Sequence, residues 1–176
     1  MKETVRVMIP EEELNKRIKE LGEQISRDYA GEEIIMIGIL KGSVMFMSEL
    51  AKRITIPAQF EFMRASSYGS STESSGVVEI KLDLDHSIEG KNVLIIEDII
   101  DTGNTLSCLQ KLLRTRGPKS LKTIALLEKP ARREAYDVEF DYVGFEIPDE
   151  FVVGYGLDYD QKYRNLPYVG IVEFHE

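Results

Sequence analysis

The chain has one cysteine, two histidines and no long apolar run, and each shortage excludes a class of protein. Because Cys108 is the only cysteine, no disulfide can form within the chain, which suits a reducing compartment. The longest apolar run, residues 34–40, is far too short to span a bilayer. The opening residues MKETVRVMIPEEE lack the apolar core of a signal peptide. We therefore expect a cytoplasmic protein with no membrane segment.

Basic side chains are also scarce, since 22 Lys and Arg face 31 Asp and Glu and give a net charge of −9. A sequence-independent nucleic-acid binder needs a basic face, so we expect no nucleic-acid partner. An acidic chain can still bind an anion locally, through backbone N–H groups, a few cations and a divalent metal. The length of 176 residues, 43% of them hydrophobic, fits a single domain over 1–176. His86 and His175 make no metal cluster and are interpreted as surface residues.

The apolar pattern predicts strands that alternate with helices. Helices with apolar stripes are predicted over 10–31, over 44–54, and from the turn at 101–105 to residue 116. Strands buried on both faces are predicted at 34–40 and 93–97, because residues 34–40 and 93–96 are continuous apolar runs. Further strands are predicted over 58–65, 77–84, 122–127, 142–147, 152–155 and 168–174. The alternation in the middle of the chain predicts an α/β fold with a mostly parallel sheet.

Two adjacent acids end the second of these buried strands, in the segment VLIIEDIIDTGNTL at 93–106. A carboxylate is costly to place at the end of a buried strand, so Glu97 and Asp98 call for a functional explanation. In open parallel sheets, ligands bind at the carboxyl ends of the strands. Two neighbouring carboxylates can accept hydrogen bonds from ribose hydroxyls or help to hold a metal ion.

The turn at 101–105 is a candidate phosphate site. Gly103 lets the backbone come close to a ligand, and Thr102 and Thr105 offer hydroxyls. The helix that begins here offers free N–H groups and a favourable dipole. Neither GxxxxGK[ST] nor GxGxxG occurs, which excludes a Walker A loop and a dinucleotide fingerprint. Acids beside a phosphate site would bind another part of the same ligand, such as ribose hydroxyls. They therefore indicate a sugar phosphate as the ligand.

The segment VLIIEDIIDTGNTL resembles the phosphoribosyl-pyrophosphate motif of type I phosphoribosyltransferases, and most closely that of the hypoxanthine-guanine phosphoribosyltransferase family. The resemblance extends from about 8 to 172, with further blocks LKGS at 40–43, LLEKP at 126–130 and DEFVVGYGLDYDQKYRNLPYVGIV at 149–172. It implies a three-layer α/β fold whose mostly parallel sheet (core about 30–147) is flanked by helices. It also implies a small hood, from the N-terminal segment and about 148–176, a mobile antiparallel lid hairpin, and a homodimer or homotetramer.

The resemblance implies a site for phosphoribosyl pyrophosphate. Within this site, Asp101 resembles the general base of the family, and Arg164 resembles an arginine that contacts pyrophosphate. The Lys41-Gly42 step matches a position that often carries a non-proline cis peptide. The residues implied to bind phosphoribosyl pyrophosphate are Leu40, Lys41, Gly42, Glu97, Asp98, Asp101, Thr102, Gly103, Asn104, Thr105 and Arg164.

The resemblance also implies a purine site and a metal. The Lys129 ammonium would donate to the exocyclic oxygen of a 6-oxopurine. A 6-amino group cannot replace this oxygen, because an amino group does not accept a hydrogen bond from an ammonium. Phe151 would stack on the purine, and the backbone of Val152 would meet the ring edge. Asp158 is implied both beside the purine and as a ligand of Mg²⁺ near pyrophosphate. The implied metal residues are Glu97, Asp98 and Asp158.

The segment 66–76, in which six of eleven residues are serine, is predicted to be a mobile loop between two antiparallel strands. Within it, Ser67 and Tyr68 match the lid of the family. Closing such a lid would exclude water from a reactive sugar cation.

The implied activity is Mg²⁺-dependent transfer of the 5-phosphoribosyl group to hypoxanthine, and also to guanine, in purine salvage. The preference among hypoxanthine, guanine and xanthine stays open, as does transfer to another base. A nucleotide-sensing regulator with the same fold would be distinguished by binding to RNA or DNA at moderate salt. An aspartyl-phosphate protein would be labelled by a small phosphodonor and would leave the segment 149–172 unexplained.

Overall fold

The computed structural model describes residues 1–67 and 78–176. Its elements are, in chain order, β1 (Lys2–Ile9), α1 (Glu11–Asp28), β2 (Ile34–Ile39), α2 (Val44–Ala51), β3 (Ala58–Ser67), β4 (Val78–Leu82), β5 (Asn92–Ile100), α3 (Asn104–Arg114), β6 (Ser120–Glu128), the 3-10 turn η1 (Pro130–Arg132), β7 (Tyr142–Glu146), β8 (Val152–Val153) and β9 (Val169–His175). None of the helices in the described ranges is long and apolar enough to cross a membrane.

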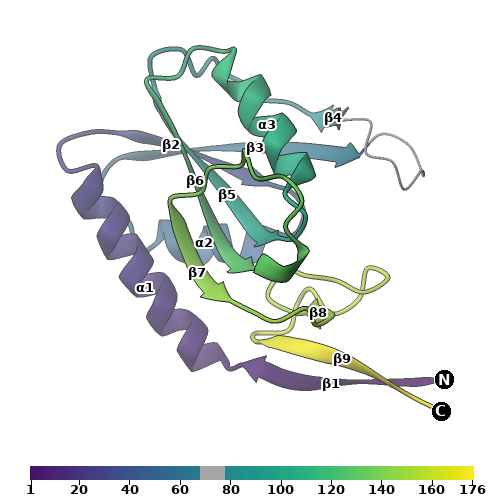
Figure 1. The fold of residues 1–176 in the computed structure, drawn as a ribbon. Coiled ribbons are helices and arrows are strands. Elements are labelled where there is room, and N and C mark those ends of the chain that lie inside the picture. The colour runs from purple at the N-terminus through teal and green to yellow at the C-terminus, as the bar shows by residue number, and fades with distance from the viewer. Residues whose placement is uncertain (68–77) are drawn as a thin grey trace.

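Six strands form the central sheet, in the order β4-β3-β2-β5-β6-β7. Neighbouring strands from β3 to β7 run parallel, and β4 pairs antiparallel with β3. Figure 1 shows that β5, β6 and β7 point the same way and end on the same side of the molecule. The predicted α/β fold with a mostly parallel sheet is therefore confirmed.

Helices cover both faces of this sheet, which explains the continuous apolar runs. Met36 and Leu94 pack in one apolar cluster with α1 and α2, whereas Ile37 and Ile95 pack in a second cluster with α3. Because successive side chains of a strand point to opposite faces, a strand between two layers of helices has no solvent-facing side. The predicted stripe of α1 is at most 1% exposed, at Leu14, Ile18, Leu21 and Ile25.

A second sheet of three antiparallel strands, in the order β1-β9-β8, joins the two ends of the chain. Figure 1 shows it beyond the ends of β5, β6 and β7, with β1 in purple beside β9 in yellow. The strand β1 was not predicted, because its side chains alternate between exposed and half-buried and Val7 is 48% exposed. The division of the chain into a core and a hood stays a prediction.

Several predicted boundaries differ from the structure. All three helices end earlier than predicted, at Asp28, Ala51 and Arg114. The strand β5 continues past the acids to Ile100, because Ile99 pairs with Leu127 of β6 and Ile100 with its last residue. Glu97 and Asp98, which were predicted to end this strand, therefore lie near its carboxyl end but are followed by two more strand residues.

Candidate active site

Glu97 and Asp98 form a pair of adjacent carboxyl groups near the carboxyl end of β5. Burial and the negative charge of Asp98 raise the pKa of Glu97 well above its ordinary value. Burial also raises the pKa of Asp98 to about 6, although the N–H of Ile99 and the positive charge of Arg164 oppose this shift. Both carboxyl groups are thus harder to ionise than ordinary acids, and hydroxyl donors or a cation would stabilise their charged form.

The chain turns sharply after β5 and begins α3. Gly103 has a left-handed backbone, with φ of 83°, which a side chain would strain. Its carbonyl accepts the N–H of Ser107 at 2.9 Å, and the N–H of Asn104 lies 3.3 Å from the Thr102 hydroxyl. This geometry presents the backbone of the turn at the N-terminus of an eleven-residue helix, the place where anions bind.

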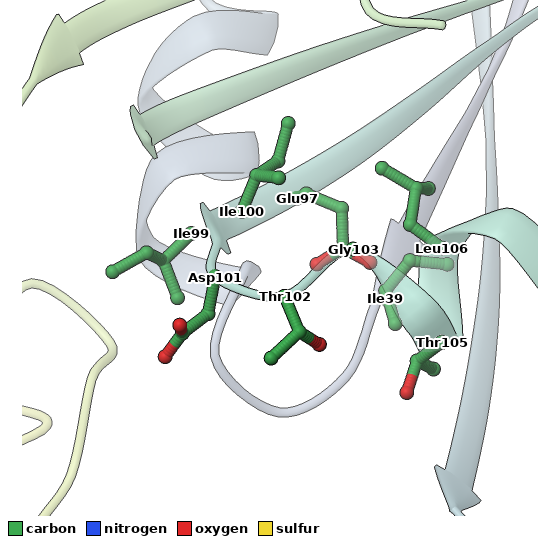
Figure 2. A pocket seen from close by; sticks show the side chains of 9 residues that line it. All are labelled: Ile39, Glu97, Ile99, Ile100, Asp101, Thr102, Gly103, Thr105 and Leu106. Atoms are coloured by element: carbon green, nitrogen blue, oxygen red, sulfur yellow. The ribbon is translucent and has the colours of Figure 1, made fainter. Parts of the chain in front are cut away.

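A cavity of about 210 Å³ lies at this turn. Figure 2 shows the Asp101 carboxylate and the Thr102 hydroxyl pointing away from β5 into open space, with Glu97 beside Gly103. One carboxyl group of the buried pair and the phosphate turn thus face one space, as a sugar phosphate would need. The cavity is lined by Ile39, Glu97, Ile99, Ile100, Asp101, Thr102, Gly103, Thr105 and Leu106.

Two cations approach this end of the sheet from separate segments. The Lys41 ammonium and the Arg164 guanidinium both lie 3.4 Å from the same amide oxygen of Gln161. Groups that share one acceptor are close enough to contact one anion of the size of pyrophosphate. Arg164 also donates to the carbonyl of Gly156 at 2.6 Å, which fixes its guanidinium at the edge of the site.

The loop after β2 packs directly against the acids. A Cβ at Gly42 would collide with the Asp98 carboxylate, and a Cβ at Gly156 would collide with the Gly42 carbonyl. The non-proline cis peptide joins Leu40 to Lys41, so the expectation that it joins Lys41 to Gly42 is wrong by one residue. No proline marks such a bond, so the sequence offers no residue that would locate it.

The implied purine residues gather beside the carboxyl end of β6. Lys129 is 8% exposed, and its ammonium lies 3.9 Å from the Asp149 carboxylate. Phe151 is 50% exposed and meets the ring of Tyr159 edge-on, with ring centroids 5.6 Å apart. Val152 is buried in β8. A half-exposed aromatic ring supported from one side leaves its remaining surface for a flat ligand.

The three acids implied to hold a metal do not form a cage made of protein alone. Asp158 accepts the N–H of Gln161 at 2.9 Å and pairs with Arg164 at 3.3 Å. Within 1–67 and 78–176, no three His, Cys, Asp or Glu side chains are arranged to hold a metal ion. His86 and His175 are both exposed, as predicted.

The implied lid is described only at its base. Ser67 is the last residue of β3 and pairs antiparallel with Val78 of β4, which agrees with the predicted hairpin strands. Tyr68 lies outside the described residues, so its implied role stays a prediction.

Sequence reasoning missed Arg132 and Asp149. Arg132 lies 3.2 Å from the Asp101 carboxylate and 3.8 Å from that of Asp149. The sequence did contain a signal for Arg132, namely Pro130, which begins the short turn η1 that carries Arg132 back toward the end of the sheet. Gln161, which joins Lys41 to Arg164, carried no such signal.

The comparisons with known proteins agree with this geometry. The phosphoribosyl transferase domain family matches residues 10–160. A hypoxanthine phosphoribosyltransferase of Salmonella typhimurium is 56% identical over 98% of this chain and 97% of the relative. A hypoxanthine-guanine phosphoribosyltransferase of Bacillus subtilis is 53% identical over 96% of this chain and 93% of the relative.

A solved structure of a hypoxanthine phosphoribosyltransferase from Staphylococcus aureus has a TM-score of 0.92 and 54% identity, covering 96% of this chain and 91% of that chain. The chain therefore belongs to the phosphoribosyltransferase family, and its fold is the type I phosphoribosyltransferase fold. The predicted family and fold are confirmed.

Proposed function

We propose that this enzyme transfers the 5-phosphoribosyl group of phosphoribosyl pyrophosphate to hypoxanthine and guanine, giving IMP or GMP and pyrophosphate in purine salvage. The observation that carries the proposal is the cavity shared by Glu97 and the turn at 101–105, because it offers acids for ribose beside an anion site. The names of the Salmonella typhimurium and Bacillus subtilis relatives support these two bases.

The sugar phosphate would bind across this cavity. The 5-phosphate would accept from the N-terminus of α3 and from the hydroxyls of Thr102 and Thr105. Glu97 and Asp98 would accept hydrogen bonds from the ribose hydroxyls. As the bond from C1 to the pyrophosphate oxygen breaks, positive charge develops on the ribose ring, and the acid pair stabilises it.

Asp101 would accept the proton that the reaction releases. A ring nitrogen of the purine forms a bond to C1, the electron pair of the breaking C1–O bond leaves with pyrophosphate, and a nitrogen-bound proton of the imidazole ring must depart. Figure 2 shows the Asp101 carboxylate pointing out of the end of β5, and its side chain is 42% exposed. A carboxylate there is a suitable general base.

Mg²⁺ fits the donors of this site. Mg²⁺ prefers oxygen ligands and usually binds one or two carboxylates together with substrate phosphates, so it does not need a cage of three side chains. Glu97, Asp98 and Asp158 would supply those oxygens. When bound, the ion neutralises charge on the departing pyrophosphate. Lys41, the N–H of Gly42 and Arg164 would contact the same group from the protein side.

Lys129 and Phe151 would select and hold the base. The Lys129 backbone N–H donates to the carbonyl of Ile100 at 2.9 Å, which places this residue next to the end of β5. Its ammonium donates to a 6-oxo group and cannot accept from a 6-amino group, so adenine is disfavoured. Phe151 would stack on the purine, Val152 would meet its edge through the backbone, and Asp158 would lie nearby.

A homodimer or homotetramer in the cytoplasm remains part of the proposal. The helix α2 carries Val44 and Met45, which are 40% and 37% exposed, next to the loop that would bind pyrophosphate. Exposed apolar side chains beside a site are typical of contacts between subunits. We propose no nucleic-acid or membrane partner.

The test is an ultraviolet progress curve with Mg²⁺ and phosphoribosyl pyrophosphate, to which hypoxanthine, guanine, xanthine or adenine is added separately. We expect product from hypoxanthine and guanine and none from adenine. The relative rates, including that of xanthine, identify the preferred base. Folded protein that forms no product with any purine would overturn the proposal and favour a nucleotide-sensing regulator.

The variant Lys129→Met tests the assignment of the base site. We expect it to raise the KM for hypoxanthine and to leave the KM for phosphoribosyl pyrophosphate unchanged. Lys119→Met is the matched control, because Lys119 pairs with Glu32 at 2.9 Å at the opposite end of the sheet. Equal kinetics of Lys129→Met and the control for every base would reject the role of Lys129.

A further inference from the structure

Four charged side chains of alternating sign connect the proposed general base to the proposed purine lysine. They are Asp101, Arg132, Asp149 and Lys129, and we call them the ionic row. The Arg132 Nε lies 3.2 Å from Asp101 Oδ1, and its Nη1 lies 3.8 Å from Asp149 Oδ2. The Lys129 Nζ lies 3.9 Å from the other oxygen of Asp149. No step of the mechanism proposed above uses Arg132 or Asp149.

The turn that carries Arg132 is anchored on both sides. On one side, Arg133 forms a buried ion pair with Glu128 of β6 at 2.7 Å. On the other side, the N–H groups of Glu134 and Ala135 donate to the carbonyl of Thr102 at 2.9 and 3.0 Å. The turn is thus tied both to the sheet and to the phosphate turn, so the position of Arg132 relative to Asp101 is well defined.

We propose that Arg132 is a positioning residue for Asp101, and this inference rests on the function proposed above. Arg132 donates from Nε to one carboxylate oxygen of Asp101, Oδ1, at 3.2 Å. A base is effective when a third group fixes its orientation, as in catalytic triads. Arg132 would hold Asp101 so that Oδ2 faces the purine nitrogen that loses its proton.

Asp149 extends this role to base recognition. It lies between the cations Arg132 and Lys129, at nearly equal distances of 3.8 and 3.9 Å, which are too long for short hydrogen bonds. A 6-oxo group that binds Lys129 would compete with Asp149 for the ammonium. Asp149 would then pair more closely with Arg132, so the arrival of the correct base would strengthen the hold on Asp101.

The first test compares Arg132→Met and Arg132→Lys with wild type. Positioned general bases contribute about 10²- to 10⁴-fold to rate, and loss of orientation should remove part of this, so we expect Arg132→Met to lower kcat by about 10-fold or more. The KM for phosphoribosyl pyrophosphate should not change. Arg132→Lys keeps the charge and should recover part of kcat. Arg114→Met is the control, because Arg114 pairs with Glu139 on the surface at 3.0 Å.

The second test is a double-mutant cycle with Asp101→Asn. If Arg132 acts through Asp101, Arg132→Met should lower kcat less than about twofold in the Asp101→Asn background, because coupled effects are not additive. Equal losses in both backgrounds, or a loss that appears in the KM for phosphoribosyl pyrophosphate, would overturn the inference and leave the proposed function standing. A wild-type protein without activity would overturn both.

Discussion

The central strands of the six-stranded sheet are buried on both faces, whereas the three-stranded sheet leaves much of its surface open. All six residues of β2 and the first six of β5 are buried. In the smaller sheet, β1 is mostly exposed or half-buried. Phe174 of β9 is 48% exposed, and Phe151, just before β8, is exposed to a similar degree. The first sheet holds acids and a phosphate turn at fixed positions, and the second offers an aromatic surface.

This difference suggests a division of tasks within one site. The acids and the phosphate turn must keep their positions relative to a sugar whose charge changes, and they lie on or directly after β5, a central strand whose first six residues are buried. A flat base needs contact area and one specific donor, which an exposed ring and Lys129 can supply. The two sheets nevertheless share one apolar cluster, since Leu14 and Met36 lie in the same cluster as Val152 and Ile171.

The largest expected effect comes from weakening that shared cluster. Leu14 is fully buried, and Leu14→Ala should lower the free energy of unfolding by about 2–5 kcal/mol. Because both sheets contact this cluster, we expect circular dichroism and tyrosine fluorescence to report one urea transition at the same midpoint. Leu113→Ala, in the α3 cluster, is the matched variant. A separate early transition in Leu14→Ala alone would mean that the small sheet unfolds independently.

Gly42→Ala should damage the phosphoribosyl side while leaving the purine side intact. The added Cβ would collide with the Asp98 carboxylate, and a shift of about 1 Å in a reacting group can cost about 10²-fold in rate. We expect kcat/KM for phosphoribosyl pyrophosphate to fall by about this factor. Gly31→Ala is the control for a glycine replaced without a clash, because an added Cβ at Gly31 has no neighbour within 4 Å, although its backbone is left-handed with φ of 80°. Similar activity of the two variants would contradict the close packing of Gly42 on Asp98.

Phe151→Ala should damage the purine side of the site while leaving the phosphoribosyl side intact. Stacking of a base on an aromatic ring contributes about 1–3 kcal/mol, so the KM for hypoxanthine should rise roughly 5- to 150-fold. The KM for phosphoribosyl pyrophosphate should stay constant. Phe60→Ala is the control, since Phe60 is 54% exposed on β3 and lies in neither proposed substrate site. An unchanged hypoxanthine KM in Phe151→Ala would remove the aromatic surface from the proposed site.

The acid pair of the six-stranded sheet predicts that the stability of the fold depends on pH. Burial raises the pKa of Asp98 from 3.8 to about 6, so between these values the folded protein binds more protons than the unfolded chain. The contribution of Asp98 to the free energy of unfolding therefore falls as pH rises from about 4 to about 6, by about 1.4 kcal/mol per pKa unit. Urea unfolding at several pH values should show a shallower fall in Asp98→Asn. Asp160→Asn, at an exposed carboxyl, should follow wild type, and an identical slope in Asp98→Asn would refute the shift.

Patterns that depend on burial on both sides were predicted well from the sequence. The run IIMIGIL and the stripe of Leu14 and Ile18 follow directly from packing between layers, and the structure confirms both. The turn with Gly103 was located because glycine tolerates the left-handed backbone observed there. These features depend on neighbours in the chain, or on one face of one element.

Features that depend on distant partners were missed. The strand β1 exists because β9, from the other end of the chain, pairs with it, and its own residues are mostly exposed. The end of β5 is set by its pairing with Leu127 and Glu128, which the apolar run alone does not indicate. Arg132 and Asp149 gain significance only because two separate segments place them beside Asp101 and Lys129.

The pairing of β1 with β9 brings the beginning and the end of the described chain together, since Lys2 pairs with His175. A short loop between these residues would turn the pair into an ordinary β-hairpin. The chain could then be opened at an exposed turn remote from the site, such as the one at Gly90, which has no neighbour within 4 Å of an added Cβ. We expect such a circular permutant to fold with the same site, because the contacts that build it do not require the present order of the elements.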